Sequence, residues 1–224
     1  MIELFQITGS ASFASRAALE EMGAPYTTVD IHPRRRDEIP DFAAVNPLKR
    51  IASLRDGEVS VYETGAILLY LGDRFPAAKL APPIGDPARG AYLRWIVWLS
   101  NSLHEIWYPY QYPGFFVSED PASHDGIRAK AKANIISVGD YLESELDGHQ
   151  WCLGEAFSLA DIYLYMLTGW QNYNEDGLTL GGANVQAHFA RVGAREAIKK
   201  TRELDDLQEN FIRNHPELRA GKPI

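Results

Sequence analysis

Residues 51–75, IASLRDGEVSVYETGAILLYLGDRF, contain a predicted hairpin followed at once by a predicted helix. The apolar runs 51–54 and 59–61 flank Arg55-Asp56-Gly57-Glu58, and Asp-Gly between two apolar runs is typical of a tight β-turn. Residues 63–75 then carry Ile67, Leu68 and Leu71 at helical spacing. This stretch therefore predicts two antiparallel strands that lead directly into a helix.

The residues before the hairpin predict a strand, a helix and a second strand. Residues 2–7 form a short apolar run, and residues 26–31 are rich in β-branched and aromatic side chains. Between them, residues 14–23 place apolar side chains near one helical face and end on Gly23. The predicted order is βαβ followed by ββα, which indicates an α/β unit built around one sheet.

A proline-rich linker separates this unit from a helical region. Residues 76–87 contain Pro76, Pro82, Pro83 and Pro87, and proline resists helix continuation. Further helices are predicted at 89–108, at 127–146, from Ser158 onward, at 191–200 and at 204–214. We therefore expect an α/β domain at 1–76, a linker at 77–87 and an all-helical domain at 88–224.

The composition excludes several classes of protein. The chain has 224 residues and a net charge of −8, whereas a nucleic-acid binder or a protein that docks on anionic membranes needs a basic surface. The single cysteine, Cys152, excludes an internal disulfide framework and a Cys-rich zinc module, so we expect no metal. No apolar run reaches the ~20 residues that span a bilayer, and the first residues lack signal-peptide features. We therefore expect a cytoplasmic protein.

Four stretches in this order and at these spacings resemble the cytosolic glutathione transferases. They are Asn46-Pro47 ahead of 51–54, Tyr62-Glu63-Thr64-Gly65-Ala66-Ile67, Ser158-Leu159-Ala160-Asp161-Ile162-Tyr163 and the loop Thr8-Gly9-Ser10-Ala11-Ser12-Phe13-Ala14-Ser15-Arg16. Leu103-His104 and Thr168-Gly169-Trp170 are most similar to bacterial, beta-like members. The resemblance spans nearly the whole chain. It implies a thioredoxin-like βαβββα-type N-terminal domain, a C-terminal helical bundle, glutathione as co-substrate and a homodimer.

Glu63 and Thr64 match the residues that hold the γ-glutamyl end of glutathione in this family. An acid suits its ammonium group, and the N–H groups of a helix start attract its carboxylate, with Thr64 as a cap. The alternative is an ordinary helix N-terminus, where both residue types are common.

The loop at 49–53 departs from the family pattern. Members pair the cysteinyl backbone of glutathione with the residue before a cis-proline; Ile51 fits the pairing position, but Ala52 replaces the proline. A cis bond before a residue other than proline costs about 2.5–4 kcal/mol, so we expect a trans bond and a displaced loop. The alternative is a cis bond held by its surroundings. Lys49 and Arg34 are candidates to bind the glycyl carboxylate, or else they are solvated loop residues.

The resemblance places the residue that activates the thiol in the loop before the first helix. Ala11 stands where beta-like members have cysteine, so chemistry on such a cysteine is not expected. Ser12, four residues before Arg16, matches the serine of serine-type members, and Ser10 is the second candidate. Either hydroxyl would stabilise a thiolate, whose free thiol has a pKa of ~8.5. Alternatively, both serines cap the helix.

His104 resembles the histidine that beta-like members direct from the helical domain into the substrate cleft. A histidine there donates to a thiolate or to a substrate oxygen. The alternative is a polar residue on a half-exposed helix. Tyr108, Tyr110 and Tyr112 follow it and either line an apolar pocket or lie in the core or an interface.

Two functions remain open from these residues. The first is a glutathione S-transferase that transfers the glutathione thiolate to a small hydrophobic electrophile, as in detoxification. The second is a non-catalytic protein of the same fold that binds a ligand or a partner, which the replacements Ala11 and Ala52 favour. Glu63 and Thr64 are compatible with glutathione binding in both cases.

Overall fold

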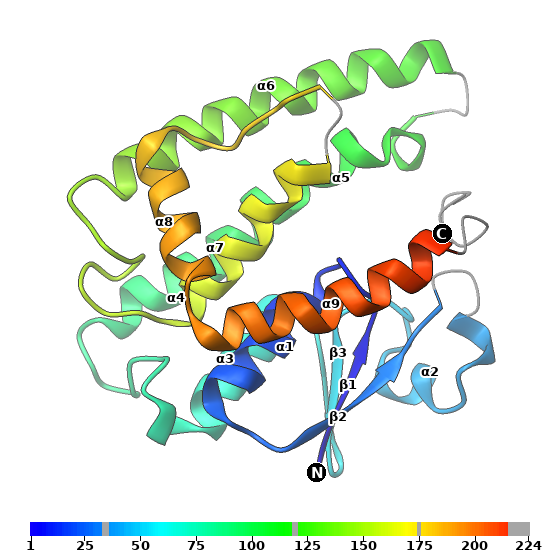
Figure 1. Cartoon of the computed structure of the whole chain (residues 1–224), viewed down its shortest axis with the longest axis vertical. Coiled ribbons are helices and arrows are strands. Elements are labelled where there is room, and N and C mark those ends of the chain that lie inside the picture. The colour runs from blue at the N-terminus through cyan, green and yellow to red at the C-terminus, as the bar shows by residue number, and fades with distance from the viewer. Residues whose placement is uncertain (33–35, 118–120, 174–175, 215–224) are drawn as a thin grey trace. The chain divides into compact units, whose positions relative to one another are not determined.

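The computed structural model describes residues 1–32, 36–117, 121–173 and 176–214 (Figure 1). Contacts between Cα atoms divide the chain into two units. The first unit contains Met1–Pro83 and the described residues from Ala194 onward, and the second unit contains Ile84–Gly193. The division into a domain 1–76, a linker and a domain 88–224 stays a prediction.

The first unit is built on a mixed four-stranded sheet with the strand order β2-β1-β3-β4. Its strands are β1 (Ile2–Gln6), β2 (Tyr26–Asp30), β3 (Ser53–Asp56) and β4 (Val59–Tyr62). β1 pairs in parallel with β2 and antiparallel with β3, and β3 and β4 form the hairpin that Asp56-Gly57 predicts. This sheet with its helices is the thioredoxin-like architecture expected from the sequence.

Helices pack on both faces of this sheet. Phe5 stacks on Phe42 of the short helix α2 (Phe42–Val45) with 5.4 Å between ring centroids. Side chains alternate across a strand, so the buried Leu4 points to the opposite face. There α1 (Ser12–Met22) and α3 (Thr64–Arg74) contact the strands. Helix α2 was not predicted from the sequence, because it has only four residues.

The last helix, α9 (Glu196–Asn214), lies along α1 (Figure 1). The small residues Ala14, Ala17 and Ala18 are fully buried on α1, which allows another helix to approach closely. The prediction of two helices at 191–200 and 204–214 is wrong. Helix α9 is continuous, and the helical structure is interrupted between Gly193 and Glu196. Arg195, in this break, forms two hydrogen bonds with Glu21 at 2.5 and 2.7 Å, so a distant contact sets the boundary.

The second unit is helical in the described residues. Its helices are α4 (Arg89–Trp98), α5 (Glu105–Gln111), α6 (Pro121–Glu145), α7 (Leu159–Gly169) and α8 (Ala183–Gly193). The single helix predicted at 89–108 is divided, because a π-helical stretch, Leu99–His104, joins α4 to α5. Pro109 within α5 cannot donate a backbone hydrogen bond, which adds to the irregularity.

Helix α7 is buried along nearly its whole length, from Leu159 to Thr168. Asp161 accepts the backbone N–H of Ser158 at 2.7 Å and thereby forms a capping box with Ser158 at the start of this helix. Among the described residues, no helix is both long enough and apolar enough to cross a bilayer.

Candidate functional site

Three segments of the first unit meet at one end of the sheet. The register pairs Phe5 with Ser53 and Ser53 with Tyr62. The residues that follow β1, precede β3 and follow β4 therefore lie side by side. These are the loop before α1, the loop that contains Ile51 and Ala52, and the start of α3.

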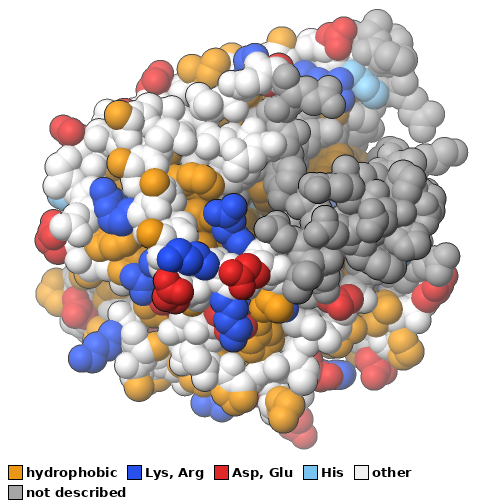
Figure 2. Space-filling view, in the orientation of Figure 1, with side chains coloured by type: hydrophobic (Ala, Val, Ile, Leu, Met, Phe, Trp, Pro, Cys, Tyr) orange, Lys and Arg blue, Asp and Glu red, His pale blue; other side chains and the backbone are white. Residues whose placement is uncertain are grey.

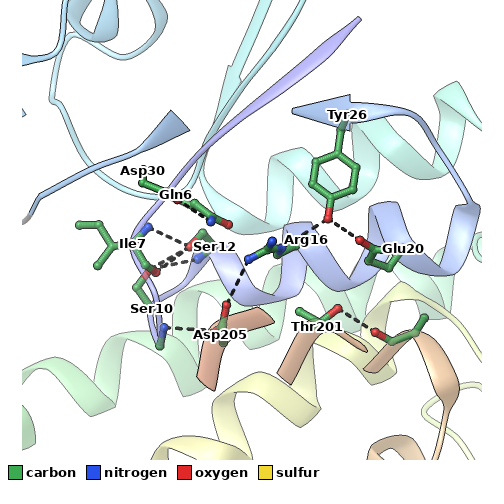
Figure 3. A network of polar contacts seen from close by, with 12 residues as sticks. Gln6, Ile7, Ser10, Ser12, Arg16, Glu20, Tyr26, Asp30, Thr201 and Asp205 are labelled. Carbon is green, nitrogen blue, oxygen red and sulfur yellow. Dashed lines mark hydrogen bonds and ion pairs between the residues drawn. The ribbon is translucent and has the colours of Figure 1, made fainter. Parts of the chain in front are cut away.

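The loop before α1 is folded around the backbone of Ile7. The Ser12 hydroxyl donates to the Ile7 carbonyl at 2.9 Å and accepts the Ile7 N–H at 3.2 Å. The Ser10 hydroxyl reaches the same carbonyl at 2.6 Å and lies 3.0 Å from the Ser12 hydroxyl. Both candidate serines are thus brought together, and both bind their own loop (Figure 3).

The two serines differ in exposure and in what each hydroxyl does. Ser12 is 2% exposed and is bound on its donor and acceptor sides by one peptide unit. Ser10 is half-buried and accepts the Ser12 N–H at 3.3 Å, as a residue before a helix does. Ser10 therefore has the more accessible hydroxyl.

The Ile51–Ala52 peptide bond is cis, so the expectation of a trans bond is wrong. The cost of a cis bond in an isolated peptide does not include the surroundings of this loop. The buried Asn46 amide donates to the Arg50 carbonyl at 3.0 Å and to the Ser53 hydroxyl at 3.1 Å, and therefore holds both ends of the loop. Ala52 is buried and Ile51 is half-buried against the cluster that contains Phe5.

Glu63 and Thr64 occupy the start of α3. Glu63 precedes the first helical residue with a φ of 72°, and its exposed carboxylate has no partner among the described residues. The N–H groups of a helix's first turn have no intrahelical acceptor and favour an anion. Glu63 and this helix start thus present an acid and backbone donors at one place.

Thr64 does not cap α3, contrary to the expectation. It is 3% exposed, and its hydroxyl donates to the Ala11 carbonyl at 3.3 Å. This hydrogen bond joins the start of α3 to the loop that carries Ser10 and Ser12. The physical reason is that Thr64 lies inside the helix, while the capping position belongs to Glu63.

Of the two basic candidates, Lys49 lies among the described residues. Lys49 forms an ion pair with Asp37, a carboxylate that is 87% exposed. The Lys49 carbonyl accepts Arg36 Nη1 at 3.1 Å. Arg34 lies outside the described residues.

His104 ends the π-helical stretch of the second unit and is 9% exposed. Its Nδ1 lies 2.8 Å from the Tyr163 hydroxyl, and its ring contacts the rings of Tyr108 and Trp170. Burial lowers the pKa of His104 to about 4, so the imidazole is neutral at neutral pH. The buried Nε2 has no partner among the described residues.

The tyrosines after His104 occupy three different environments. Tyr108 is half-buried against His104, and Tyr112 is 52% exposed beside Phe115. Tyr110 donates to Asp176 at 2.6 Å. Burial, and then this carboxylate, raise the pKa of Tyr110 to about 12.

Cys152, Asp161 and His188 form a compact buried group whose possible ligand atoms lie within 4.8 Å of one another. Both Asp161 oxygens are already used: Oδ1 accepts Cys152 N–H and bonds His188 Nε2, and Oδ2 accepts two bonds from Ser158. Burial, and then the Asp161 charge, raise the pKa of the Cys152 thiol well above its usual value. The group therefore suits a structural network better than a metal ion.

Sequence reasoning missed Asp205, which lies beside the candidate loop. Its carboxylate accepts the Gly9 N–H at 3.3 Å across 196 residues of sequence. No local pattern marks it, since it is one of several acids in a polar helix.

Comparisons with known proteins agree with this geometry. The family model described as the glutathione S-transferase N-terminal domain matches residues 1–73, and the corresponding C-terminal domain model matches residues 116–196. The glutathione S-transferase GstA of Escherichia coli O157:H7 is 27% identical, over 88% of this chain and 97% of the relative.

Solved structures of this family share the fold over nearly the whole chain. A sphingomonad glutathione S-transferase complexed with glutathione is 30% identical, with a TM-score of 0.79, over 92% of this chain and 99% of the other. The beta-class enzyme of Sphingomonas chungbukensis is 27% identical, with a TM-score of 0.77, over 91% and 98%. The chain therefore belongs to the glutathione S-transferase family.

Proposed function

We propose that this protein binds glutathione in its first unit and transfers the glutathione thiolate to a small hydrophobic electrophile. The observation that carries the proposal is the convergence of three segments: the serine loop, the loop at Ile51 and the start of α3. Family membership and the glutathione-bound relative support the same function.

The γ-glutamyl end of glutathione would bind at the start of α3. Its carboxylate would accept the unpaired N–H groups of the first turn, and its ammonium would pair with the exposed Glu63. Thr64 would contribute indirectly, because its hydroxyl fixes the helix start to the Ala11 carbonyl. The cysteinyl backbone would pair with the backbone of Ile51, next to the buried Ala52.

The thiolate would lie beside the loop before α1. We assign the activating hydrogen bond to Ser10, whose half-buried hydroxyl can turn from the Ile7 carbonyl toward a ligand. Ser12 would support Ser10, because its own hydroxyl bridges the Ile7 peptide unit. A hydrogen bond to the thiolate lowers the pKa of the thiol and raises the reactive fraction at neutral pH.

The glycyl carboxylate would bind the basic residues near the loop at 49–53. Lys49 is the candidate that the structure describes, and its partner Asp37 is 87% exposed. Exposed ion pairs contribute about 0–1 kcal/mol, so glutathione can replace Asp37 at little cost. Arg34 remains a candidate from the sequence.

The electrophile would bind to aromatic side chains of the second unit. Tyr108, Tyr112 and Phe115 follow one another along this surface. His104 would position the aromatic side chains of this surface, because its ring contacts Tyr108 while its Nε2 is buried. His104 would act in its neutral form, because its pKa of about 4 keeps it uncharged.

We also propose a cytoplasmic homodimer with a role in detoxification. Exposed apolar side chains on α4 and α6 support self-association, as exposed apolar surface commonly marks an interface. They are Leu93, Val97, Ile136 and Tyr141.

Calorimetric titration with reduced glutathione, followed by turnover with an activated aryl chloride, tests the proposal. We expect binding in the micromolar to low-millimolar range and glutathione-dependent release of chloride. Glu63→Gln provides a check on the site, because loss of the charge should weaken glutathione binding about tenfold. Absence of glutathione binding would contradict the proposal. Binding without turnover, or no binding at all, would favour the non-catalytic alternative.

A further inference from the structure

A buried polar network ties α9 to α1 and β2 (Figure 3). Arg16 on α1 is 7% exposed, and its Nε donates to the Tyr26 hydroxyl at 3.3 Å. Its Nη1 lies 3.6 Å from Asp205 Oδ1. Tyr26 in turn donates to Glu20 at 2.5 Å, and Glu20 pairs with Lys200 of α9. A buried guanidinium needs such partners because removing its charge from water is costly.

The second carboxylate oxygen of Asp205 binds a residue that lies outside α1 and α9. Oδ1 faces Arg16, while Oδ2 accepts the backbone N–H of Gly9 at 3.3 Å. The Asp205 side chain is only 14% exposed, so little water competes for this hydrogen bond. One carboxylate thus bridges a buried arginine and the loop before α1.

Gly9 lies at the turn of that loop. Its φ is 70°, in the left-handed region that favours glycine, and Ser10 N–H closes the turn on the Ile7 carbonyl at 3.2 Å. The same carbonyl accepts the Ser10 hydroxyl. The position of the Gly9 peptide therefore affects where the Ser10 hydroxyl lies.

We propose that Asp205 is a positioning residue for glutathione activation. Held by Arg16, it fixes the Gly9 peptide and thereby the Ser10 hydroxyl that faces the thiol. The inference rests on the proposed glutathione site and adds a residue of the C-terminal helix to it. The residue acts through the loop and does not touch the substrate.

Other contacts already hold the two helices together. Glu21 binds Arg195 through two hydrogen bonds, and Glu20 binds Lys200 at 2.6 Å. Figure 2 shows basic and acidic side chains interleaved over the N-terminal half of α9. The Gly9 bond is thus a second role for Asp205 besides helix packing, and Glu21 provides a matched control.

The test compares Asp205→Ala, Asp205→Asn and Glu21→Gln in the full chain. A misplacement of about 1 Å can lower turnover a hundredfold, so we expect Asp205→Ala to lower kcat at least tenfold. It should also raise the pKa of the bound glutathione thiol by about one unit, read from thiolate absorbance. Asp205→Asn retains an acceptor for Gly9 and should lie between Asp205→Ala and the unchanged protein. Glu21→Gln should change kcat less than about twofold, because it breaks only the ion pair between α1 and Arg195, the residue that precedes α9.

Hydrogen exchange at the Gly9 amide separates this inference from the proposed function. We expect exchange to accelerate at least tenfold in Asp205→Ala and to remain unchanged in Glu21→Gln, whether or not glutathione is turned over. Unchanged exchange at Gly9 in a folded Asp205→Ala protein would overturn the inference. An equal loss of kcat in Glu21→Gln would also overturn it. If exchange at Gly9 changes in the variants as expected but the unchanged protein fails to bind glutathione, the proposed function is contradicted instead.

Discussion

Ser10 and Ser12 make different contributions to the loop before α1, although both hydroxyls reach the Ile7 carbonyl. A hydroxyl has one hydrogen, so a serine that donates to a thiolate must give up its present acceptor. Ser12 would break a buried bond to do so, whereas Ser10 would leave its carbonyl still bound by Ser12. The chemistry therefore favours Ser10 as the donor and Ser12 as its support.

Ser10→Ala should impair activation more selectively than Ser12→Ala. Removing one preorganised donor from a developing or stabilised anion commonly lowers turnover 10²–10³-fold, and we expect about tenfold or more here. The pKa of the bound thiol should rise by about one unit, because the thiolate loses a hydrogen bond. Ultraviolet titration of bound glutathione and steady-state kinetics provide the measurements.

Protein stability distinguishes the two serine variants. Ser12→Ala leaves the partly buried Ile7 N–H without its partner and should reduce the free energy of unfolding by about 1–3 kcal/mol. Ser10→Ala should change it by less than about 1 kcal/mol. If instead Ser12→Ala alone raised the thiol pKa, then Ser12 would be the donor.

His104 makes stability depend on pH in a predictable direction. Burial lowers its pKa from 6.5 to about 4, so the unfolded chain binds a proton in this range while the folded chain does not. Stability is therefore fully present above pH 6.5 and is lost as the pH falls toward 4. At about 1.4 kcal/mol per pKa unit, the loss from this one group is about 3 kcal/mol.

Urea unfolding at several pH values tests this dependence. We expect His104→Asn, which can still bond the Tyr163 hydroxyl, to remove about 3 kcal/mol of the loss between pH 6.5 and 4. Replacing the exposed His149 with Asn is the control for the loss of a histidine at the surface. If the free energy of unfolding depended on pH equally in the His104 variant and the unchanged protein, the His104 imidazole would not be the group responsible for this dependence.

Individual elements were predictable where their signals are local. The Asp56-Gly57 turn fixes the β3–β4 hairpin, and the stripe Ile67, Leu68 and Leu71 is fully buried on α3, as its spacing predicted. The candidate residues Glu63 and Thr64 follow this hairpin directly. Their convergence with the Ile51 loop follows from the strand register, which the sequence leaves open.

Elements set by distant contacts were not predictable in the same way. Apart from Gly193, residues 191–200 are mostly helix-forming, but the chain turns at Ala194 and Arg195, and Arg195 binds Glu21. The cis bond at Ile51–Ala52 lies in a loop whose ends are held by Asn46. The free energy cost of a cis bond, taken alone, favours trans there, because it does not include the hydrogen bonds from Asn46.

At the scale of the whole molecule, α9 packs against α1, although the two helices are far apart in the sequence. Asp205 meets Gly9, and Arg195 meets Glu21, across more than 170 residues of sequence. Such pairings carry no periodic signature, and so the contribution of α9 to the candidate site could not be predicted from the sequence. Family resemblance predicted the two-part architecture well, yet it pointed to Ser12, Ser10 and His104 and left Asp205 unnoticed.

The exposed apolar side chains on α4 and α6 favour self-association of the whole molecule. Leu93 and Val97 lie one turn apart on α4, and they are 37% and 50% exposed. Arg94 donates to the hydroxyl of the 40% exposed Tyr141, which places α6 beside them. For large apolar side chains on neighbouring helices, contact with a second copy of the chain is more favourable than exposure to water.

Val97→Asp should therefore weaken the proposed dimer. A carboxylate placed in an apolar interface loses its hydration without gaining a partner, so we expect the dimer dissociation constant to rise at least about a hundredfold. Sedimentation equilibrium measures the change. Ile84→Asp is the matched control, because Ile84 is an 85% exposed apolar residue that belongs to neither α4 nor α6, and it should leave the dissociation constant within about twofold. A monomeric unchanged protein, or equal effects of both substitutions, would show that this surface does not join two copies.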